Sequence, residues 1–238
     1  MYEKPFYIKD PVWNNAFGQP SRTWRHLFVP GLLKGGFIDL KIWGEIVFEE
    51  IIDDEIKGFR GLENFLETEY KGIPTYISDN HNHAFYFWSL AMKMWLIWSW
   101  ATLIHIDEHS DMREPETYLD QKDFSDMGKV FGYTNNVLNV WNYIKPAIRA
   151  WILNNLYNIQ SEWGLDNMWA EFDLINWDII LNLDLDFFSE EMEYIDYWKK
   201  KDLIRRIAEK SKLITISTSP FFIDQERAIR VCMDIFAP

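Results

Sequence analysis

The fold is decided by the stretch TLIHIDEHSD, which spans residues 102–111. It begins as a largely apolar run, which is typical of a strand covered on both faces of a parallel sheet. It ends in Asp107, His109 and Asp111, and on an extended backbone these alternate residues point to one side. The stretch therefore predicts a buried strand whose carboxyl end carries a group of polar side chains.

Three other segments share this apolar character. They are residues 73–78, 179–186 and 213–219. Short apolar runs rich in Ile and Leu are typical of strands buried in a parallel sheet. The run at 179–186 also ends in two acids, Asp184 and Asp186. We therefore expect four parallel strands, two of which carry acids at their carboxyl ends.

Helical patterns separate these strands. They span residues 83–99, 136–160, 190–211 and 223–235. Pro146 is expected to bend or split the second helix, and a strand or hairpin with a turn at Gly44 is expected within residues 37–48. Alternating strands and helices predict right-handed crossovers, and therefore an α/β fold with three layers, α/β/α, around a largely parallel sheet. No linker or repeat divides the chain, so a single domain is expected.

The chain is strongly acidic. Its 238 residues include 37 Asp and Glu but only 24 Lys and Arg, for a net charge of −13. Such a surface repels nucleic acid and attracts cationic substrates and divalent metal ions. The single Cys232 cannot form an internal disulfide, and with no signal peptide expected this favours the cytoplasm. Residues 84–106 are nearly all apolar, but Lys93 interrupts them, so we expect a buried helix and strand there and no membrane span.

Buried acids at strand ends need a counter-charge. The acids concerned are Asp107, Asp111, Asp184 and Asp186. Buried carboxylates without partners are strongly destabilising, whereas two divalent cations would balance four negative charges. Carboxylates together with imidazoles suit Mn²⁺, with Co²⁺, Ni²⁺, Fe²⁺ and Zn²⁺ as competitors. Two such ions can share a water molecule and lower its pKa, which predicts a hydrolase acting at an electrophilic carbon or phosphorus.

The remaining histidines are interpreted one by one. His81 and His83 follow the first strand, and either could supply an imidazole to the metal site. His105 lies inside its strand, two residues before Asp107, and is interpreted as a core histidine with satisfied hydrogen bonds. His26 lies in a loop and is assigned no function.

The two acidic motifs resemble those of arginases and agmatinases. Residues 107–111 resemble the Asp-x-His-x-Asp signature of that superfamily, and residues 184–186 resemble its Asp-x-Asp signature. The sequence is most similar to a smaller arginase-like family, some members of which are peptide arginases that convert arginine side chains of ribosomally made peptides to ornithine. The boxes of that family read Asp-Asn-His at 79–81, LDLDFFS at 183–189 and Thr-Ser-Pro at 218–220.

The resemblance implies an arginase-like fold in which residues 71–238 form the catalytic core and residues 1–70 form an N-terminal part of unassigned structure. It also implies two Mn²⁺ ions. The first would be bound by His81, Asp107, Asp111 and Asp184. The second would be bound by Asp107, His109, Asp184 and Asp186. His81 is preferred over His83 because it occupies the histidine position of the Asp-Asn-His motif at 79–81.

The reaction implied by the resemblance is guanidine hydrolysis. A hydroxide bridging the two Mn²⁺ ions would attack the guanidinium carbon, giving urea and ornithine, and Asp186 would receive the proton. A carboxylate must hold the guanidinium, and the candidates are Glu108, Asp224 and Glu226. The resemblance favours Asp224 or Glu226, because arginases place a guanidinium-contacting glutamate after the strand that corresponds to residues 213–219. The expected partner is an arginine-containing precursor peptide. A homo-oligomer is typical of arginases, but no residue pattern here marks an interface.

The sequence departs from the larger arginases in two places. No histidine lies between Met112 and Tyr133, where those enzymes have a proposed proton shuttle, and their Gly-Gly-Asp-His box is altered. A shorter chain would leave an open cleft, which suits an arginine inside a peptide. Two alternatives stay open. One is a related ureohydrolase or a deacetylase-type amidohydrolase, the latter with one Zn²⁺, and the other is a non-catalytic binding protein stabilised by its metal.

Overall fold

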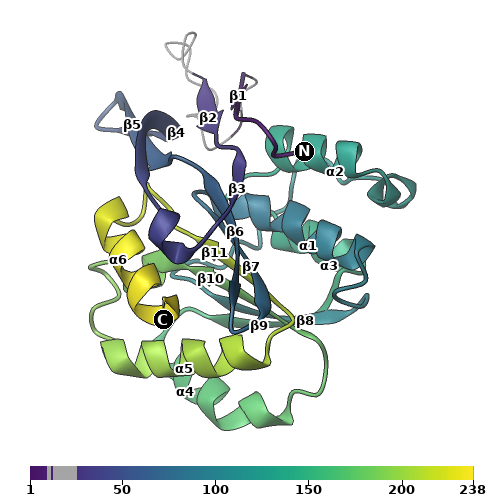
Figure 1. Cartoon of the computed structure of the whole chain (residues 1–238), viewed down its shortest axis with the longest axis vertical. Helices are drawn as coiled ribbons and strands as arrows, with labels where there is room; N and C mark the ends of the chain where they lie inside the picture. Colours follow the sequence, from purple (N-terminus) through teal and green to yellow (C-terminus); the bar gives the residue numbers. More distant parts are fainter. Residues whose placement is uncertain (10–11, 13–25, 238) are drawn as a thin grey trace.

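A sheet that has seven strands in the described part of the chain lies at the centre of the molecule (Figure 1). The computed structural model describes residues 1–9, 12 and 26–237. In spatial order the strands are β3 (Leu32–Lys34), β6 (Phe65–Tyr70), β7 (Ile73–Ser78), β11 (Leu213–Ser217), β10 (Ile179–Asp184), β8 (Ala101–Ile106) and β9 (Leu153–Ile159). Neighbouring strands are parallel except for the antiparallel pair β6 and β7. The prediction of an α/β fold with a largely parallel sheet is confirmed.

In the described part of the chain, six helices cover the two faces of this sheet and form the outer layers. They are α1 (Ala84–Lys93), α2 (Met127–Asn136), α3 (Ile144–Arg149), α4 (Glu162–Glu171), α5 (Tyr197–Lys210) and α6 (Gln225–Phe236). Side chains of α1, α2 and α3 share one buried cluster, and those of α4, α5 and α6 share the other. Figure 1 shows the first set to the right of the sheet and the second below it and to its left. This is the expected three-layer α/β/α arrangement.

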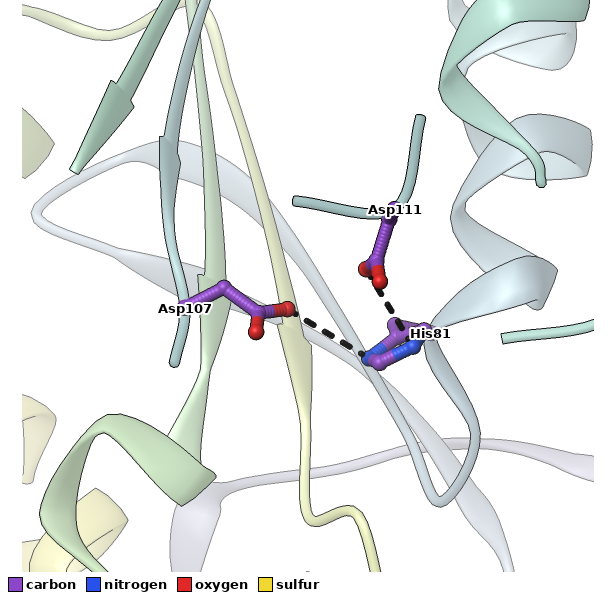
Figure 2. Close-up of side chains that lie close together, drawn as sticks. All are labelled: His81, Asp107 and Asp111. Carbon is purple, nitrogen blue, oxygen red and sulfur yellow. Dashed lines mark ion pairs between the residues drawn. The ribbon is translucent and has the colours of Figure 1, made fainter. Parts of the chain in front are cut away.

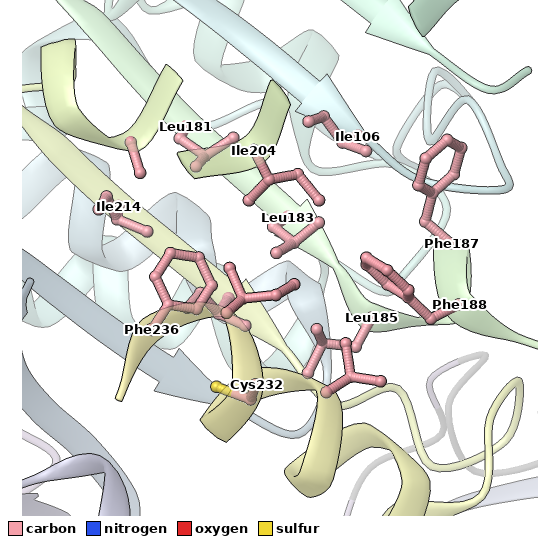
Figure 3. Close-up of a cluster of buried hydrophobic side chains, with 14 of the residues drawn as sticks. Ile106, Leu181, Leu183, Leu185, Phe187, Phe188, Ile204, Ile214, Cys232 and Phe236 are labelled. Carbon is pink, nitrogen blue, oxygen red and sulfur yellow. The ribbon is translucent and has the colours of Figure 1, made fainter. Parts of the chain in front are cut away.

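Alternation along the strands sends apolar side chains into both clusters. In β10, Leu181 and Leu183 pack on the side of α4, α5 and α6, whereas Ile180 packs on the other side. Figure 3 shows Leu183 among Ile106 of β8, Ile204 of α5 and other members of that cluster. Burying a side chain of this size contributes about 1.5–3 kcal/mol, so the central strands anchor the fold.

The predicted strand at 179–186 is shorter than expected. β10 ends at Asp184, and Asp186 lies in the 3-10 turn η6 (Leu185–Phe188) that follows. The turn begins where the side chain of Asp184 accepts a hydrogen bond from the backbone N–H of Asp186, at 2.9 Å. The two acids are therefore placed by a turn and not by strand alternation.

The predicted helix at 136–160 is wrong over most of its length. Only α3 is helical, with Pro146 in its first turn, where the missing proline N–H costs little. Trp151 has a φ of 62°, which ends the helical path, and residues 153–159 form the edge strand β9 instead. The helix α2 was not predicted, and it begins where Asp126 accepts a hydrogen bond from the backbone N–H of Gly128 at 2.8 Å.

The other predicted helices are confirmed with different ends. The first stops at Lys93, because Trp95 has a left-handed φ of 60°. The third starts at Tyr197, where Asp196 caps the helix, and the fourth corresponds to α6. The segment 84–106 forms α1 and β8, and no helix among the described residues is long and apolar enough to cross a membrane.

The described residues of the N-terminal part, 1–9, 12 and 26–70, pack onto the same body. They form β1 (Phe6–Ile8), β2 (Leu27–Val29), the sheet strands β3 and β6, and a hairpin of β4 (Ile42–Ile52) and β5 (Glu55–Leu62), with a short 3-10 turn η2 (Phe37–Asp39). The hairpin turn lies at Asp53 and Asp54, whose φ angles are 55° and 62°, and not at Gly44 as predicted. Both turn residues are Asp, which tolerates positive φ better than most side chains.

Candidate metal centre

The carboxyl ends of two neighbouring strands define the site. Asp184 is the last residue of β10, and Asp107 directly follows β8. The strands are parallel and pair Leu183 with Ile106, so the two acids lie at the same level of the sheet. Both are fully buried. His81, the first residue of the 3-10 turn η3 (His81–His83) before α1, points into this region from beyond the carboxyl end of β7, which β11 separates from β10.

The first candidate ligand group contains His81, Asp107 and Asp111 (Figure 2). His81 Nε2 lies 3.3 Å from Asp111 Oδ2, and His81 Nδ1 lies 3.8 Å from Asp107 Oδ2. Asp184 joins this group, because its Oδ2 is hydrogen-bonded to His81 Nδ1 and accepts the hydroxyl proton of Ser219. Four side chains from three strand ends therefore converge on one buried point.

The backbone reaches this point by a turn. Residues after Ile106 are no longer in a strand, and Asp111 has a φ of 52°. The expectation that strand alternation would aim Asp107, His109 and Asp111 to one side is therefore wrong in its geometry. The left-handed conformation, which Asp tolerates, turns the Asp111 carboxylate back toward His81 instead.

The second candidate group contains Asp107, His109 and Asp186. His109 Nδ1 lies 3.0 Å from Asp186 Oδ2 and 3.4 Å from Asp107 Oδ1. Asp107 belongs to both groups, and its two oxygens face different ones: Oδ1 faces His109, and Oδ2 faces His81. A carboxylate shared in this way is suited to bridging two cations.

Several carboxylate oxygens of the cluster have no hydrogen-bond partner in the described part of the chain. They are Oδ2 of Asp107 and both side-chain oxygens of Asp111. A buried polar atom without a partner costs about 1–3 kcal/mol, and more when it is charged. Oxygen and imidazole ligands in this arrangement fit a hard or borderline divalent cation. The buried His and Asp groups could therefore hold metal ions.

The pKa values of the acids reflect their crowding. Burial, together with the nearby charges of Asp111 and Asp184, raises the pKa of Asp107 to about 7. Burial and the charges of Asp107 and Asp184 also raise the pKa of Asp186 well above its usual range. Like charges this close disfavour ionisation of one another, and a cation relieves the repulsion.

The pKa values of the His81 and His109 imidazoles are raised, as expected for imidazoles surrounded by carboxylates. Burial works against the charged form of His81, yet the acids Asp111 and Asp184 raise its pKa well above the ordinary value. His109 is also penalised by burial, but its hydrogen bonds to Asp107 and Asp186 raise its pKa to about 10. The site therefore has the strongly negative potential that binds cations.

His83 is placed away from the acids. Its Nδ1 is hydrogen-bonded to the Tyr2 hydroxyl at 2.8 Å, and its ring lies 4.8 Å from that of Phe65. Burial lowers the pKa of His83 to about 3. Of the two candidate histidines, His81 is the one that lies among the carboxylates, and His83 packs against the N-terminal segment.

His105 is buried as predicted but is only partly satisfied. Its Nδ1 is hydrogen-bonded to Asn182 at 2.8 Å, whereas its Nε2 has no hydrogen-bond partner among the described residues. Nε2 lies 3.4 Å from Asp107 Oδ2 and 3.5 Å from Asp111 Oδ2. The interpretation as an ordinary core histidine is therefore wrong, because residues two apart in a strand share a face and His105 faces the cluster with Asp107.

The three candidate guanidinium carboxylates lie in different surroundings. Glu108 is next to the ligands: its backbone N–H donates to Asp186 Oδ1 at 3.2 Å, and its side chain accepts from Ser189 at 3.1 Å. Asp224 caps α6 by accepting from the backbone N–H of Arg227 at 2.9 Å. The Glu226 side chain is 75% exposed and lies 3.6 Å from Arg230. The structure thus brings Glu108 to the cluster and gives the other two acids roles on α6.

Aromatic side chains flank the solvent-facing part of the centre, a feature that sequence reasoning missed. The His109 side chain is 30% exposed, whereas those of His81, Asp107 and Asp111 are at most 1% exposed. The His109 ring lies 4.7 Å from the ring of Phe222 and 5.5 Å from that of Trp141. Phe222 also belongs to an apolar cluster with side chains of the β4–β5 hairpin. No periodic pattern in the sequence marks this grouping, because its members come from three distant segments.

No protein-family model matches the sequence, and no curated protein matches it. The resemblance to arginases therefore stays a prediction that rests on the motifs at 79–81, 107–111, 183–189 and 218–220.

Proposed function

We propose that this protein is a metal-dependent hydrolase of the arginase type, and that its substrate is an arginine side chain within a peptide. The products would be urea and a peptide that contains ornithine. One observation carries the proposal: two His/Asp groups, each able to hold a cation, share the buried carboxylate of Asp107. A pair of divalent ions at such a site is one arrangement that supports metal-assisted hydrolysis.

Two Mn²⁺ ions are the proposed cofactors. The first would be held by His81, Asp107, Asp111 and Asp184, and the second by Asp107, His109, Asp184 and Asp186. The donors fit, because these residues offer carboxylate oxygens and imidazole nitrogens, and oxygens of Asp107 and Asp111 lack other partners among the described residues. When bound, divalent ions at such a site supply positive charge and lower the pKa of a coordinated water.

The chain's own residues would orient the substrate and move the proton. Glu108 is the proposed guanidinium partner, because its backbone and side chain are held beside the ligands while the residue is partly exposed. Trp141 and Phe222 place aromatic rings beside His109, and the Trp141 ring already carries a cation, the guanidinium of Arg113 at 4.8 Å. Asp186 is the proposed proton acceptor and is held 3.0 Å from His109 Nδ1. The net charge of −13 would attract a cationic peptide.

The test is a comparison of peptides with the free amino acid. The protein is loaded with Mn²⁺ and incubated with arginine-containing peptides or with free arginine, and urea and peptide mass are measured. The proposal expects urea, with a loss of CN2H2 for each arginine converted, on peptides and not on free arginine. The matched control is Asp107→Ala, which lacks the shared ligand and should release no urea.

Each other outcome points to a different function. Turnover of free arginine alone would indicate a small arginase. Release of acetate from acylated amines, with one metal per chain, would favour the deacetylase-type alternative. Two bound metals with no turnover of any arginine-containing peptide would overturn the proposed substrate class and favour a metal-stabilised binding protein.

A further inference from the structure

A row of buried polar residues crosses the middle of the sheet beneath the metal ligands. Thr215 of β11, Asn182 of β10 and His105 of β8 occupy neighbouring positions, because the register pairs Thr215 with Asn182 and Asn182 with His105. Each is at most 2% exposed. Buried polar groups in an otherwise apolar sheet are costly unless they are paired, so their hydrogen bonds are informative.

The hydrogen bonds of this row have a direction. The indole N–H of Trp88, which can only donate, lies 3.1 Å from Thr215 Oγ1. The Thr215 hydroxyl then donates to Asn182 Oδ1 at 2.7 Å, which orients the amide with its nitrogen on the other side. Asn182 Nδ2 donates to His105 Nδ1 at 2.8 Å and to the Tyr143 hydroxyl at 2.8 Å. An imidazole that accepts at Nδ1 and is neutral carries its proton on Nε2.

The reversed amide is the competing arrangement. It would give the Tyr143 hydroxyl an acceptor, but the nearest other acceptor for the Thr215 proton would be the carbonyl oxygen of Leu181 at 3.5 Å. It would also turn the lone pair of His105 Nε2 toward two carboxylate oxygens, at 3.4 and 3.5 Å. A lone pair facing carboxylates is repelled, whereas an N–H facing them is attracted. The carboxylates near Nε2 therefore favour the first amide orientation over the reversed one.

We infer that His105 is a positioning residue, a neutral imidazole whose Nε2–H is held toward the carboxylates of Asp107 and Asp111 by the chain from Trp88 through Thr215 and Asn182. The inference rests on the metal site of the proposed function, but not on its substrate. Partners that orient metal ligands in this way are worth about 10- to 100-fold in metal affinity. His105 thus orients the two ligands whose oxygens lack other partners.

The tautomer of His105 can be measured directly in the protein without substrate or metal. The two ring nitrogens have different ¹⁵N chemical shifts in the two tautomers, and the His105 signals are assigned by their loss in His105→Gln. The expected result is a proton on Nε2. In Thr215→Val, which removes the hydroxyl that orients the amide, a mixture of tautomers is expected. The matched control is Thr75→Val on the neighbouring strand β7, because the Thr75 hydroxyl donates to the backbone carbonyl of Ile73, which is outside the row.

Metal affinity provides the second readout, with Mn²⁺ as the probe. His105→Phe should weaken Mn²⁺ binding roughly 10- to 100-fold, and His105→Gln, which keeps an N–H near the position of Nε2, should recover most of the loss. A proton on Nδ1 in the wild-type protein, or wild-type Mn²⁺ affinity in a folded His105→Phe, would overturn the inference. Neither readout uses an arginine substrate, so a failure of the proposed reaction would leave this result intact. If His105→Phe does not fold, the Thr215→Val spectrum still decides.

Discussion

Two rows of buried polar residues cross the same strands, two residues apart, and they differ in how they are satisfied. In the lower row, Thr215 and Asn182 find hydrogen-bond partners within the protein. In the upper row, Asp107 and Asp184 carry like charges, and Asp107 Oδ2 has no hydrogen-bond partner among the described residues. The rows meet at His105 Nε2. Hydrogen bonds within the lower row stabilise the fold, whereas the surplus negative charge of the upper row is suited to holding a cation.

The largest effect should come from removing a ligand in the upper row. Asp184→Ala removes a carboxylate that is hydrogen-bonded to His81 and Ser219. Residues that only hydrogen-bond to metal ligands are worth about 10- to 100-fold in metal affinity or activity, so loss of a ligand should lower Mn²⁺ affinity and urea release by more than about 100-fold. Metal per chain is measured by elemental analysis after gel filtration. Glu226→Gln, on an exposed acid of α6, is the control. Two bound ions in Asp184→Ala would remove this residue from the ligand set.

Metal binding should also raise the stability of the folded protein. Mn²⁺ at about 100 times its dissociation constant should raise the free energy of unfolding by about 2.7 kcal/mol. For a chain of 238 residues this corresponds to a rise in Tm of roughly 5–10 °C. Thermal unfolding is followed with Mn²⁺ and with a chelator. The rise should be much smaller in Asp111→Asn, and an equal rise in that variant would mean that Mn²⁺ binds elsewhere.

A change in the lower row should lower the stability of the fold even when no metal is bound. Asn182→Leu keeps a similar volume but leaves Thr215, Tyr143 and His105 without their partner. The free energy of unfolding should fall by about 1–3 kcal/mol in the metal-free protein. Urea denaturation with a chelator present measures it. A loss confined to the Mn²⁺-loaded protein would show that this row serves only the metal.

A further expected effect is a change in the pH dependence of stability. Burial, with Asp111 and Asp184 nearby, raises the pKa of Asp107 from 3.8 to about 7. Between these values the folded state holds a proton that the unfolded chain releases, so Asp107 makes the metal-free fold less stable as pH rises. Asp107→Asn removes this cost. In chelator the variant should exceed the wild type by more than about 1 kcal/mol near pH 8, and the gap should close near pH 4. A gap that does not change with pH would contradict the assignment.

The central strands and their acids could be predicted because both signals are local. Continuous apolar runs mark strands buried on two faces, and parallel strands bring their carboxyl ends to one edge. Asp107 and Asp184 were therefore expected to meet. His105 and Asn182 lie two residues before Asp107 and Asp184, and each is a polar residue within an apolar run. They could therefore have been predicted to lie side by side for the same reason.

Other features depend on contacts that no local pattern encodes. The edge strand β9 reads LNNLYNI, in which no alternation of apolar and polar residues distinguishes it from a helix. The left-handed turn at Asp111 follows from where the chain must go after β8, and the aromatic group beside His109 joins Trp141, Phe222 and the β4–β5 hairpin. Tertiary packing decides such features, because it outweighs local preference.

The position of β11 has a consequence for how the protein is made. This strand lies between β7 and β10, although it follows both in the chain. Segments leave the ribosome in sequence order, so the facing edges of β7 and β10 have no partner until residues 213–217 emerge. Exposed strand edges are templates for aggregation. A nascent chain that stalls before β11 should therefore need chaperone protection more than one whose sheet grows from strand to adjacent strand.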